Sequence, residues 1–496
     1  MSGQGGTLID YRRGDGEVCG AAELGGWDKY AGHTEECGAL SLCLRSCRPS
    51  IGIVCDMSTN HTPDLTSFWM PFTANRHFKH HPHLIVSGQG AYFTLHDGRR
   101  VFDCLSGLWC TPLGHGRPDI TDAVRAQLAE LDFAPTFQVG HPKAFELASR
   151  IARWAPGGMN RVFFSNSGSE AVDSALKIAI AYHQARGDAR RVRIIGRERA
   201  YHGVGIGGIS AGGIAVNRRT FGALAAPFVD HLPHTLDPAQ MRFSRGQPAW
   251  GAHLADVLER LVALHDASTI AAVIVEPMQG STGVIVPPVG YLERLREICT
   301  RHGILLIFDE VITGFGRLGA NFAAQRLNVT PDMIVFAKAV TNGTVPLGGV
   351  IVEQSIHDAL MHGPDQSIEL FHGYTYSGHP VACAAGLAAL EVMERERLIE
   401  RAHGLAPVLE QEVHALRDEP HVADIRNIGL AAAIDLTPRQ GAPGARARAA
   451  FELGIEAGLL LRFTGDTLAV APPFISTEED VRQMLSALRG VLRRID

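Results

Sequence analysis

Three ionisable residues stand at or directly after the ends of apolar runs in the second half of the sequence. The runs AAVIVEP, ILLIFDEV and MIVFAK deliver Glu276, Asp309 and Lys338. A lysine amine can form a Schiff base with an aldehyde, and an aspartate can keep the nitrogen of a pyridine ring protonated. Because a charged group is costly to bury without a task, three such residues in equivalent places indicate a function. Lysine and aspartate together are the pair that a pyridoxal phosphate cofactor requires.

A second motif supplies groups for the phosphate of such a cofactor. The segment RVFFSNSGSE at 161–170 predicts a strand, a turn and the start of a helix. Ser167 and Glu170 have the spacing of a capping box, and Gly168 allows the backbone to approach a ligand closely. The free N–H groups of the helix start, with the hydroxyls of Ser167 and Ser169, would form a cup for an anion. The alternative is a capped helix without a ligand, and the lysine and aspartate further along the chain favour the phosphate.

The apolar runs must be strands whose ends meet at one edge of a sheet. Unbroken runs of this length are typical of parallel strands covered on both faces, and strands alternate with helices from 160 to 340. In such α/β sheets the ligand lies outside the carboxyl ends of the strands. Elsewhere the sequence predicts a hairpin with Asp97 and Gly98 at its turn, a short β region at 422–436, and helices near 118–131, 143–154, 378–395, 398–416, 444–457 and 477–493.

These elements predict a large domain and a smaller α+β domain. We expect an N-terminal segment at 57–117 that packs with the small domain, a cofactor-binding domain at 118–376 and a small domain at 377–496. Residues 1–56 are rich in Gly and Cys and have no sustained periodicity, which predicts a disordered or non-native extension. A start codon assigned too early would explain it, with Met57 as the natural first residue.

Composition places the chain among ordinary globular proteins and excludes some partners. Of its 496 residues, 46% are hydrophobic and 20% are charged, enough for two or three domains with a large core. The net charge of −6 gives no reason to expect nucleic acid or an anionic membrane as a partner, and no apolar stretch is long enough to span a bilayer. The four cysteines after Met57 are scattered, which favours reduced thiols in a cytoplasmic protein.

Three further patterns suggest ligands that we do not expect. Gly203–Gly208 satisfies the dinucleotide pattern G-x-G-x-x-G, but no apolar strand leads into it and no acidic residue follows at the expected distance. The histidines within 76–83 have no secured helical pairing and are interrupted by Pro82, which indicates a solvated loop. The five cysteines before Met57 lack the paired spacing of a zinc site. We therefore predict no metal.

Motifs spread along the chain resemble those of a known family. SNSGSEAVDSALKIA, YHG, VEPMQGSTGVIVPP, FDEVITGFGRLG and FAK resemble class III, or ω-, aminotransferases of the type I pyridoxal phosphate fold. SGLWC, FQVGHP and LFHGYTYSGHPVACAAGLA are most similar to β-alanine:pyruvate (ω-amino acid:pyruvate) aminotransferases. The resemblance runs from about residue 60 to the end, with one departure: Ala339 follows the lysine where the family commonly has glycine. It implies an α/β fold with a mostly parallel central sheet in the large domain.

The resemblance implies roles for the three strand-end residues. Lys338 would hold the cofactor by its aldehyde carbon and move the proton between substrate and cofactor. Asp309 would pair with the ring nitrogen, which keeps the ring an electron sink. Glu276 would support this region from the neighbouring strand.

The resemblance also implies which residues surround the cofactor. Tyr201 and Val311 would stack on opposite faces of the ring, and His202 would stand beside them in the loop of Tyr201. Gly168 and Ser169 would hold the phosphate. Thr375, in HGYTYSGHP, would reach the phosphate from the second subunit of a homodimer, so that the two subunits share their active sites.

Substrate selection is implied to depend on Arg462, the mobile arginine that binds a substrate carboxylate. In ornithine, acetylornithine and 4-aminobutyrate aminotransferases a glutamate shields this arginine, and here that position is Ser281. Arg462 should therefore stay available to pyruvate or alanine, which favours pyruvate over 2-oxoglutarate. Phe72, Trp109 and Phe137 match positions that line the substrate cavity of the family, although an aromatic residue taken alone is more often part of a core.

We therefore expect transamination from an ω-amino acid or amine, such as β-alanine, to pyruvate, giving L-alanine and a semialdehyde. The alternatives are an aminotransferase of the same fold that uses 2-oxoglutarate, an aminomutase or decarboxylating enzyme, and a non-catalytic binding protein. Retention of both Lys338 and Asp309 argues against the last. The preferred donor, and the choice between dimer and tetramer, stay open.

Overall fold

The computed structural model describes residues 63–496, and the predicted extension with its five cysteines lies outside them. The chain divides into two units, 1–71 and 72–496. In the first unit the described residues, 63–71, form bends and turns with no helix or strand among them. This division does not test the predicted boundaries at 117 and 376, which stay a prediction.

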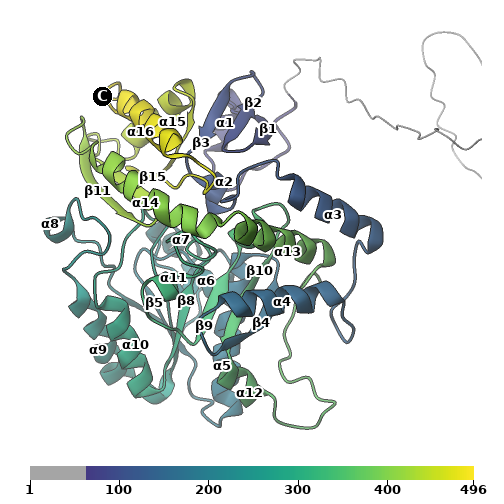
Figure 1. The fold of residues 1–496 in the computed structure, drawn as a ribbon. Helices are drawn as coiled ribbons and strands as arrows, with labels where there is room; N and C mark the ends of the chain where they lie inside the picture. Colours follow the sequence, from purple (N-terminus) through teal and green to yellow (C-terminus); the bar gives the residue numbers. More distant parts are fainter. Residues whose placement is uncertain (1–62) are drawn as a thin grey trace, which may run out of the picture. The chain divides into compact units, whose positions relative to one another are not determined.

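A seven-stranded sheet forms the centre of the second unit (Figure 1). Its order is β4 (Met159–Ser165), β10 (Gly348–Glu353), β9 (Met333–Phe336), β8 (Leu305–Asp309), β7 (Ile270–Val275), β5 (Arg193–Arg197) and β6 (Val229–Leu232). Only β10 runs antiparallel to its neighbours, and the other six strands share one direction. The predicted mostly parallel sheet is therefore confirmed.

The central strands are buried on both faces, as their unbroken apolar sequences predict. In β7, Ala272 and Ile274 pack in the core beneath α5 (Gly168–Ala185), whereas Val273 and Val275 pack in the core of the opposite face. Successive side chains of a strand point to opposite faces, so an all-apolar strand needs cover on both. Helix α12 (Gln354–Leu360) lies on the α5 side, and α4 (Pro142–Trp154) and α10 (Tyr291–His302) lie on the other.

Two smaller sheets complete the unit. One has the order β1 (Ile85–Gln89), β2 (Tyr92–Leu95), β3 (Arg100–Asp103) and β13 (Leu459–Leu460), and the other has the order β11 (Val422–Ile428), β12 (Ala431–Leu436), β15 (Thr467–Val470) and β14 (Arg462–Thr464). The predicted hairpin is β2–β3, and Gly98 at its turn has a φ of +86° that suits glycine. Because β3 pairs with β13, the N-terminal hairpin is joined to the C-terminal part of the chain.

All six predicted helices are present, with each end within two residues of its expected position. They are α3 (Pro118–Glu130), α4, α13 (Pro380–Arg395), α14 (Leu398–His414), α15 (Ala445–Glu456) and α16 (Glu478–Leu492). Proline occupies the first turn of α3, α4 and α13, where no N–H is needed, and Thr477 forms a capping box with Asp480 at α16. The remaining helices are α1 (Asn75–His80), α2 (Ser106–Trp109), α6 (Ile206–Ala211), α7 (Ala215–Phe221), α8 (Pro238–Met241), α9 (Val257–His265) and α11 (Ala323–Arg326).

Two features are absent from the part of the chain that the structure describes. None of its helices is long and apolar enough to cross a membrane. No group of three or more His, Cys, Asp or Glu residues between 63 and 496 is placed to hold a metal ion.

Candidate active site

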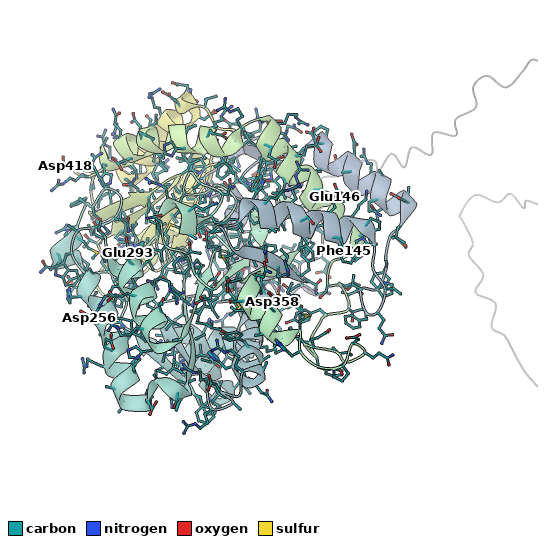
Figure 2. The ribbon with its side chains drawn as sticks, turned by 60° about the horizontal axis from the view of Figure 1, so that its bottom comes forward. Phe145, Glu146, Asp256, Glu293, Asp358 and Asp418 are labelled. Atoms are coloured by element: carbon teal, nitrogen blue, oxygen red, sulfur yellow. The ribbon has the colours of Figure 1, made fainter. Side chains whose placement is uncertain are left out.

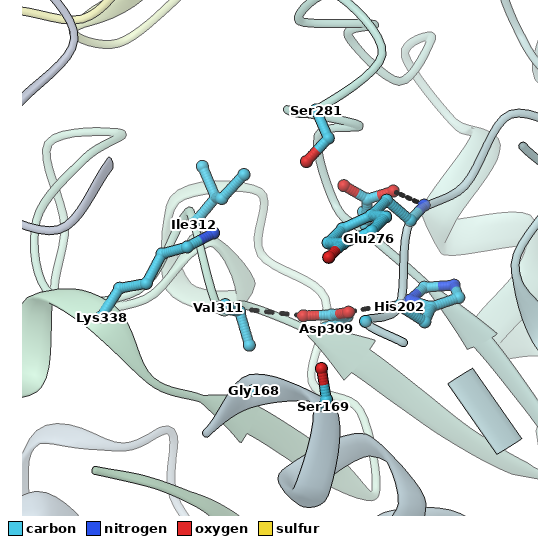
Figure 3. Close-up of a pocket in the computed structure, with 11 residues that line it drawn as sticks. Gly168, Ser169, His202, Glu276, Ser281, Asp309, Val311, Ile312 and Lys338 are labelled. Carbon is cyan, nitrogen blue, oxygen red and sulfur yellow. Dashed lines mark hydrogen bonds and ion pairs between the residues drawn. The ribbon is translucent and has the colours of Figure 1, made fainter. Parts of the chain in front are cut away.

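The carboxyl ends of three adjacent strands meet at one pocket (Figure 3). Glu276 follows β7, Asp309 is the last residue of β8, and Lys338 comes two residues after β9. The cavity has a volume of about 140 Å³ and is lined by Gly168, Ser169, Tyr201, His202, Gly203, Glu276, Ser281, Asp309, Val311, Ile312 and Lys338. Ligand pockets in α/β sheets lie at this edge.

Asp309 is held in place by two hydrogen bonds at the floor of this pocket. Its Oδ2 lies 2.8 Å from Nδ1 of His202, and its Oδ1 accepts a bond of 3.2 Å from the N–H of Val311. Both acidic and imidazole groups are buried. The other ring nitrogen of His202, Nε2, has no partner among residues 63–496. The imidazole of His202 therefore orients the carboxylate of Asp309, and Nε2 of the imidazole is available to bind a proton or a water.

Glu276 fixes two backbone segments of the pocket wall. Its carboxylate accepts bonds from the N–H of Tyr201, at 2.9 Å, and from the N–H of Gly280, at 3.1 Å. Burial raises the pKa of Glu276 to about 7; the charge of His202 opposes the shift and that of Asp309 adds to it. This buried acid thus ties the loop of Tyr201 to the segment that leads to Ser281.

Lys338 carries an unpartnered amine into the pocket. It begins a short 3-10 helix at Lys338–Thr341 and has a φ of +53°, a strained conformation of the kind that gathers at functional sites. Its amine makes no hydrogen bond or ion pair with the described residues, and burial lowers its pKa, although the nearby Cys110, Asp309 and Glu276 oppose the shift. A lowered pKa increases the neutral, nucleophilic fraction of the amine. The departure at Ala339 is accommodated, since its methyl group packs in the core.

The start of α5 forms only half of the predicted capping box. The hydroxyl of Ser167 accepts the N–H of Glu170 at 3.2 Å. The carboxylate of Glu170 bonds the backbone and side chain of Asn166, at 2.8 and 2.9 Å, and not the N–H of Ser167. Ser167 thus caps the helix and does not line the pocket, whereas Gly168 and Ser169 do.

The discounted glycine motif lies against this helix start. Gly203 has a φ of +85°, and a Cβ at this position would lie 2.7 Å from Cα of Ser169. The N–H of Val204 donates to the hydroxyl of Ser169 at 3.1 Å. Further along, Asp173 accepts the N–H of Gly208 at 3.0 Å. The spacing of the glycines therefore reflects close packing of the loop on α5.

Two pocket residues, Gly203 and Ile312, were missed by sequence reasoning. The glycine motif was itself the signal for Gly203, although it was considered only as a dinucleotide fingerprint. Ile312 follows Val311 and packs where a Cβ on Gly280 would lie only 2.5 Å from its Cδ1. An isoleucine in a buried segment carries no signal that separates a pocket wall from a core residue.

Six predicted site residues do not line the pocket of the single chain: Arg462, described below, and five others. Trp109 is buried with Arg317 over its ring, at 5.9 Å, and Phe137 lines a separate cavity with His372 and Gly373. Phe72 is exposed, with its ring 6.4 Å from that of Tyr201. Thr375 is exposed, and Ser167 caps α5. Their assigned roles stay predictions.

Arg462 is the first residue of β14 and does not line the pocket. Its guanidinium is exposed and forms no hydrogen bond or ion pair with residues 63–496. Burial raises the pKa of Tyr201 and Asp309 adds to the shift, whereas the positive charge of Arg462 opposes it. Arg462 therefore acts electrostatically on the pocket while its own charge is unpaired.

Comparison with known proteins defines the class to which this fold and site belong. Solved structures of similar fold include an (S)-enantioselective ω-transaminase from Thermomicrobium roseum, with a TM-score of 0.80 and 34% identity over 86% of this chain and 96% of the other. An amine transaminase from an uncultivated Pseudomonas species, in a PLP-bound form, has a TM-score of 0.81 and 37% identity over 88% and 100%. The fold is that of the type I pyridoxal phosphate-dependent transferases.

Sequence comparison gives the family. The family model for class III aminotransferases matches residues 73–492. An ω-aminotransferase of Caulobacter vibrioides is 57% identical over 87% of this chain and 98% of its own length, and a β-alanine–pyruvate aminotransferase of Pseudomonas aeruginosa is 50% identical over 87% and 96%. The chain belongs to the class III aminotransferases.

The pocket fits the cofactor that this family uses, pyridoxal phosphate. The amine of Lys338 has no partner among residues 63–496, and the carboxylate of Asp309 lines the same cavity (Figure 3). Val311 supplies an apolar surface, and the start of α5 with the hydroxyl of Ser169 suits a phosphate group. The pocket therefore supplies an amine for the aldehyde, a carboxylate for the ring nitrogen and a site for the phosphate.

Proposed function

We propose that this enzyme transfers the amino group of an ω-amino acid or amine, such as β-alanine, to pyruvate, giving L-alanine and a semialdehyde. The single observation that carries the proposal is the guanidinium of Arg462, which is unpaired among residues 63–496, near a pocket in which a serine, and not a glutamate, occupies position 281. The names of the relatives that are 50% and 57% identical agree with this donor and acceptor.

The residues of the pocket divide the work. Bound pyridoxal phosphate supplies an electron sink that stabilises negative charge on the substrate carbon. Lys338 would hold the cofactor, and its amine would take the proton from the substrate carbon and return it. Asp309, oriented by His202 at 2.8 Å, would keep the ring nitrogen protonated. Tyr201 and Val311, which both line the pocket, would confine the ring between them.

Arg462 and Ser281 select the substrate. A guanidinium binds a carboxylate through two parallel hydrogen bonds, so Arg462 suits pyruvate and the acid end of an ω-amino acid. A glutamate at 281 would compete for that charge, and serine cannot. The pocket therefore favours a small 2-oxo acid as acceptor.

We further propose that the working form is a homodimer with shared active sites; a homotetramer, the alternative, would pair two such dimers through a second interface. A group of exposed aromatic side chains surrounds Thr375: Phe137, Phe145 on α4 (Figure 2), Phe371 and Tyr376, with exposures of 57%, 70%, 92% and 57%. An apolar patch of this kind marks an interaction surface. A second copy that covers it would bring Thr375 toward the partner's phosphate.

A cytoplasmic location is proposed on the four cysteines after Met57. Cys104, Cys110, Cys299 and Cys383 are all free thiols. Thiols of this kind persist in a reducing compartment.

The test is product analysis of the purified protein supplied with pyridoxal phosphate, β-alanine and pyruvate. We expect stoichiometric L-alanine without release of carbon dioxide. Activity with 2-oxoglutarate but not with pyruvate would overturn the acceptor assignment. Carbon dioxide release, or movement of the amino group within one molecule, would indicate a decarboxylating enzyme or an aminomutase.

A further inference from the structure

Three consecutive carbonyl groups in the wall of the pocket are each held by a different side chain. The carbonyl oxygen of Ser281 accepts a bond of 3.2 Å from the hydroxyl of Thr464. That of Thr282 accepts one of 3.2 Å from Nη2 of Arg199, and that of Gly283 accepts one of 2.7 Å from Nε of Arg426. We call residues 281–283 the wall loop. It is held through its backbone, so the side chain of Ser281 is left to face the pocket.

The three donors come from two separate parts of the fold. Arg199 stands two residues before Tyr201, in the loop that closes the other side of the pocket. Thr464 and Arg426 belong to the sheet β11-β12-β15-β14 of the C-terminal region. The wall loop is therefore a bridge between the cofactor region and that sheet.

Thr464 connects the wall loop directly to the substrate arginine. Residues two apart in a strand point to the same face, so the side chains of Arg462 and Thr464 leave β14 on one side. Since Thr464 contacts Ser281 through its hydroxyl, Arg462 projects from the same face of the hairpin as the wall loop. This bond therefore links the strand that carries Arg462 to the wall loop.

A buried ion cluster keeps the C-terminal half of this connection rigid. The guanidinium of Arg426 is 2% exposed and bonds Asp424 at 3.0 Å and Asp435 at 2.7 and 2.9 Å. Thr467, which pairs with Thr464 across β14 and β15, donates to Asp435 at 2.6 Å. Burial works against ionisation of Asp435, but its bonds to Arg426 hold its pKa below the ordinary value. A paired and hydrogen-bonded charge cluster of this kind permits little movement.

The backbone of the wall loop has no room to adjust against this cluster. Gly283 has a φ of +111°, and a Cβ there would lie 2.9 Å from Nη2 of Arg426 and 3.0 Å from Cγ2 of Thr467. The backbone of the wall loop therefore packs against the side chains of Arg426 and Thr467, and the point of closest approach requires a glycine.

We propose that Thr464, Arg199 and Arg426 are positioning residues that determine carboxylate specificity, because their bonds to the wall loop set the separation between Ser281 and Arg462. The inference rests on the proposed function and concerns one substrate class, small 2-oxo acids and other carboxylates. None of the three residues touches the reacting carbon. They act by placing the guanidinium of Arg462 where a carboxylate bound beside Ser281 meets both of its N–H groups.

The test uses Thr464→Val, which keeps the shape of the side chain and removes the hydroxyl, with Thr464→Ser as the conservative variant. Thr464 is exposed at the end of a hairpin, so both variants should fold. Thr94→Val, the same change on strand β2 away from the pocket, is the matched control. Three quantities are measured: KM and kcat with pyruvate, the same constants with butanal, an acceptor without a carboxylate, and the calorimetric Kd for propanoate, a carboxylate that cannot react.

Thr464→Val should raise the KM for pyruvate and the Kd for propanoate roughly twofold to tenfold, because the variant loses the hydrogen bond that holds β14 to the wall loop. Its kcat, and its KM for butanal, should stay within about twofold of the original enzyme, and Thr464→Ser should restore the KM for pyruvate. Unchanged KM and Kd in Thr464→Val would overturn the inference, as would an equal loss with butanal. An original enzyme that makes no alanine from pyruvate would instead overturn the proposed function, so the two failures are distinguishable.

Discussion

Replacing Gly203 by alanine tests whether the glycine motif serves cofactor binding. Gly203 has a φ of +85°, and its missing side chain leaves the space in which Ser169 stands. A Cβ would lie 2.7 Å from Cα and 2.8 Å from Cβ of Ser169, which is closer than real Cβ atoms approach. Either the loop or the start of α5 must move, and Ser169 is the residue that we expect to bind the phosphate.

The magnitude follows from two separate costs. An alanine with positive φ loses about 1–2 kcal/mol against glycine through its backbone alone. Overpacking against Ser169 adds typically about 1–3 kcal/mol. Only the second cost acts on the phosphate site, and it corresponds to a Kd for pyridoxal phosphate that is roughly fivefold to hundredfold weaker.

Gly98→Ala is the control, because it carries the backbone cost without the overpacking. The difference between the two variants therefore measures the overpacking alone. Gly98 has a φ of +86°, almost equal to that of Gly203, and a Cβ there would meet nothing within 4 Å. Both variants and the original enzyme are titrated with pyridoxal phosphate by absorbance, and their melting temperatures are compared without cofactor. Gly203→Ala should lose affinity and Gly98→Ala should not. Equal affinity in all three proteins would refute the idea that the loop positions Ser169.

Three further changes test the roles of charged residues. Lys338→Ala should lower transamination at least a hundredfold while the phosphate site still retains cofactor, as shown by equilibrium dialysis; undiminished turnover would refute its role. Arg462→Ala should raise the KM for pyruvate far more than that of a carboxylate-free amine donor, and an equal loss for both would count against carboxylate binding. Burial raises the pKa of Glu276 from 4.5 to about 7, so its contribution to stability is complete below pH 4.5 and is lost as the pH rises through 7. Between about pH 5 and pH 8 the original enzyme should therefore lose on the order of 3 kcal/mol more unfolding free energy than Glu276→Gln, and parallel pH curves would contradict this.

Sequence reasoning predicted that Glu276, Asp309 and Lys338 would line one pocket, because the signals for these residues are local. Apolar runs identify buried parallel strands without knowledge of their neighbours, and the polar residue after each run marks the functional edge of the sheet. Glu276, Asp309 and Lys338 were found in this way, and the helix start at Gly168 by its turn and cap residues.

Features that depend on distant contacts were not predictable. Gly283 and Arg426 are 143 positions apart in the chain, and nothing in their local sequences indicates that the wall loop and β11 touch. Glu170 has the spacing of a capping box, yet it bonds Asn166, because two nearby donors compete for one carboxylate. The place of Trp109 beneath Arg317 likewise follows from tertiary packing.

The backbone anchoring of residues 281–283 has a consequence for how this enzyme could acquire new substrates. Since the hydrogen bonds of that segment with the described residues are made through its main-chain atoms, the side chain at 281 can be exchanged while the path of the chain is retained. A substitution at position 281 would change the side-chain groups that a substrate contacts, while the backbone of residues 281–283 keeps its conformation. That position is consequently a natural starting point for redesigning, or for evolving, the range of amines and keto acids accepted.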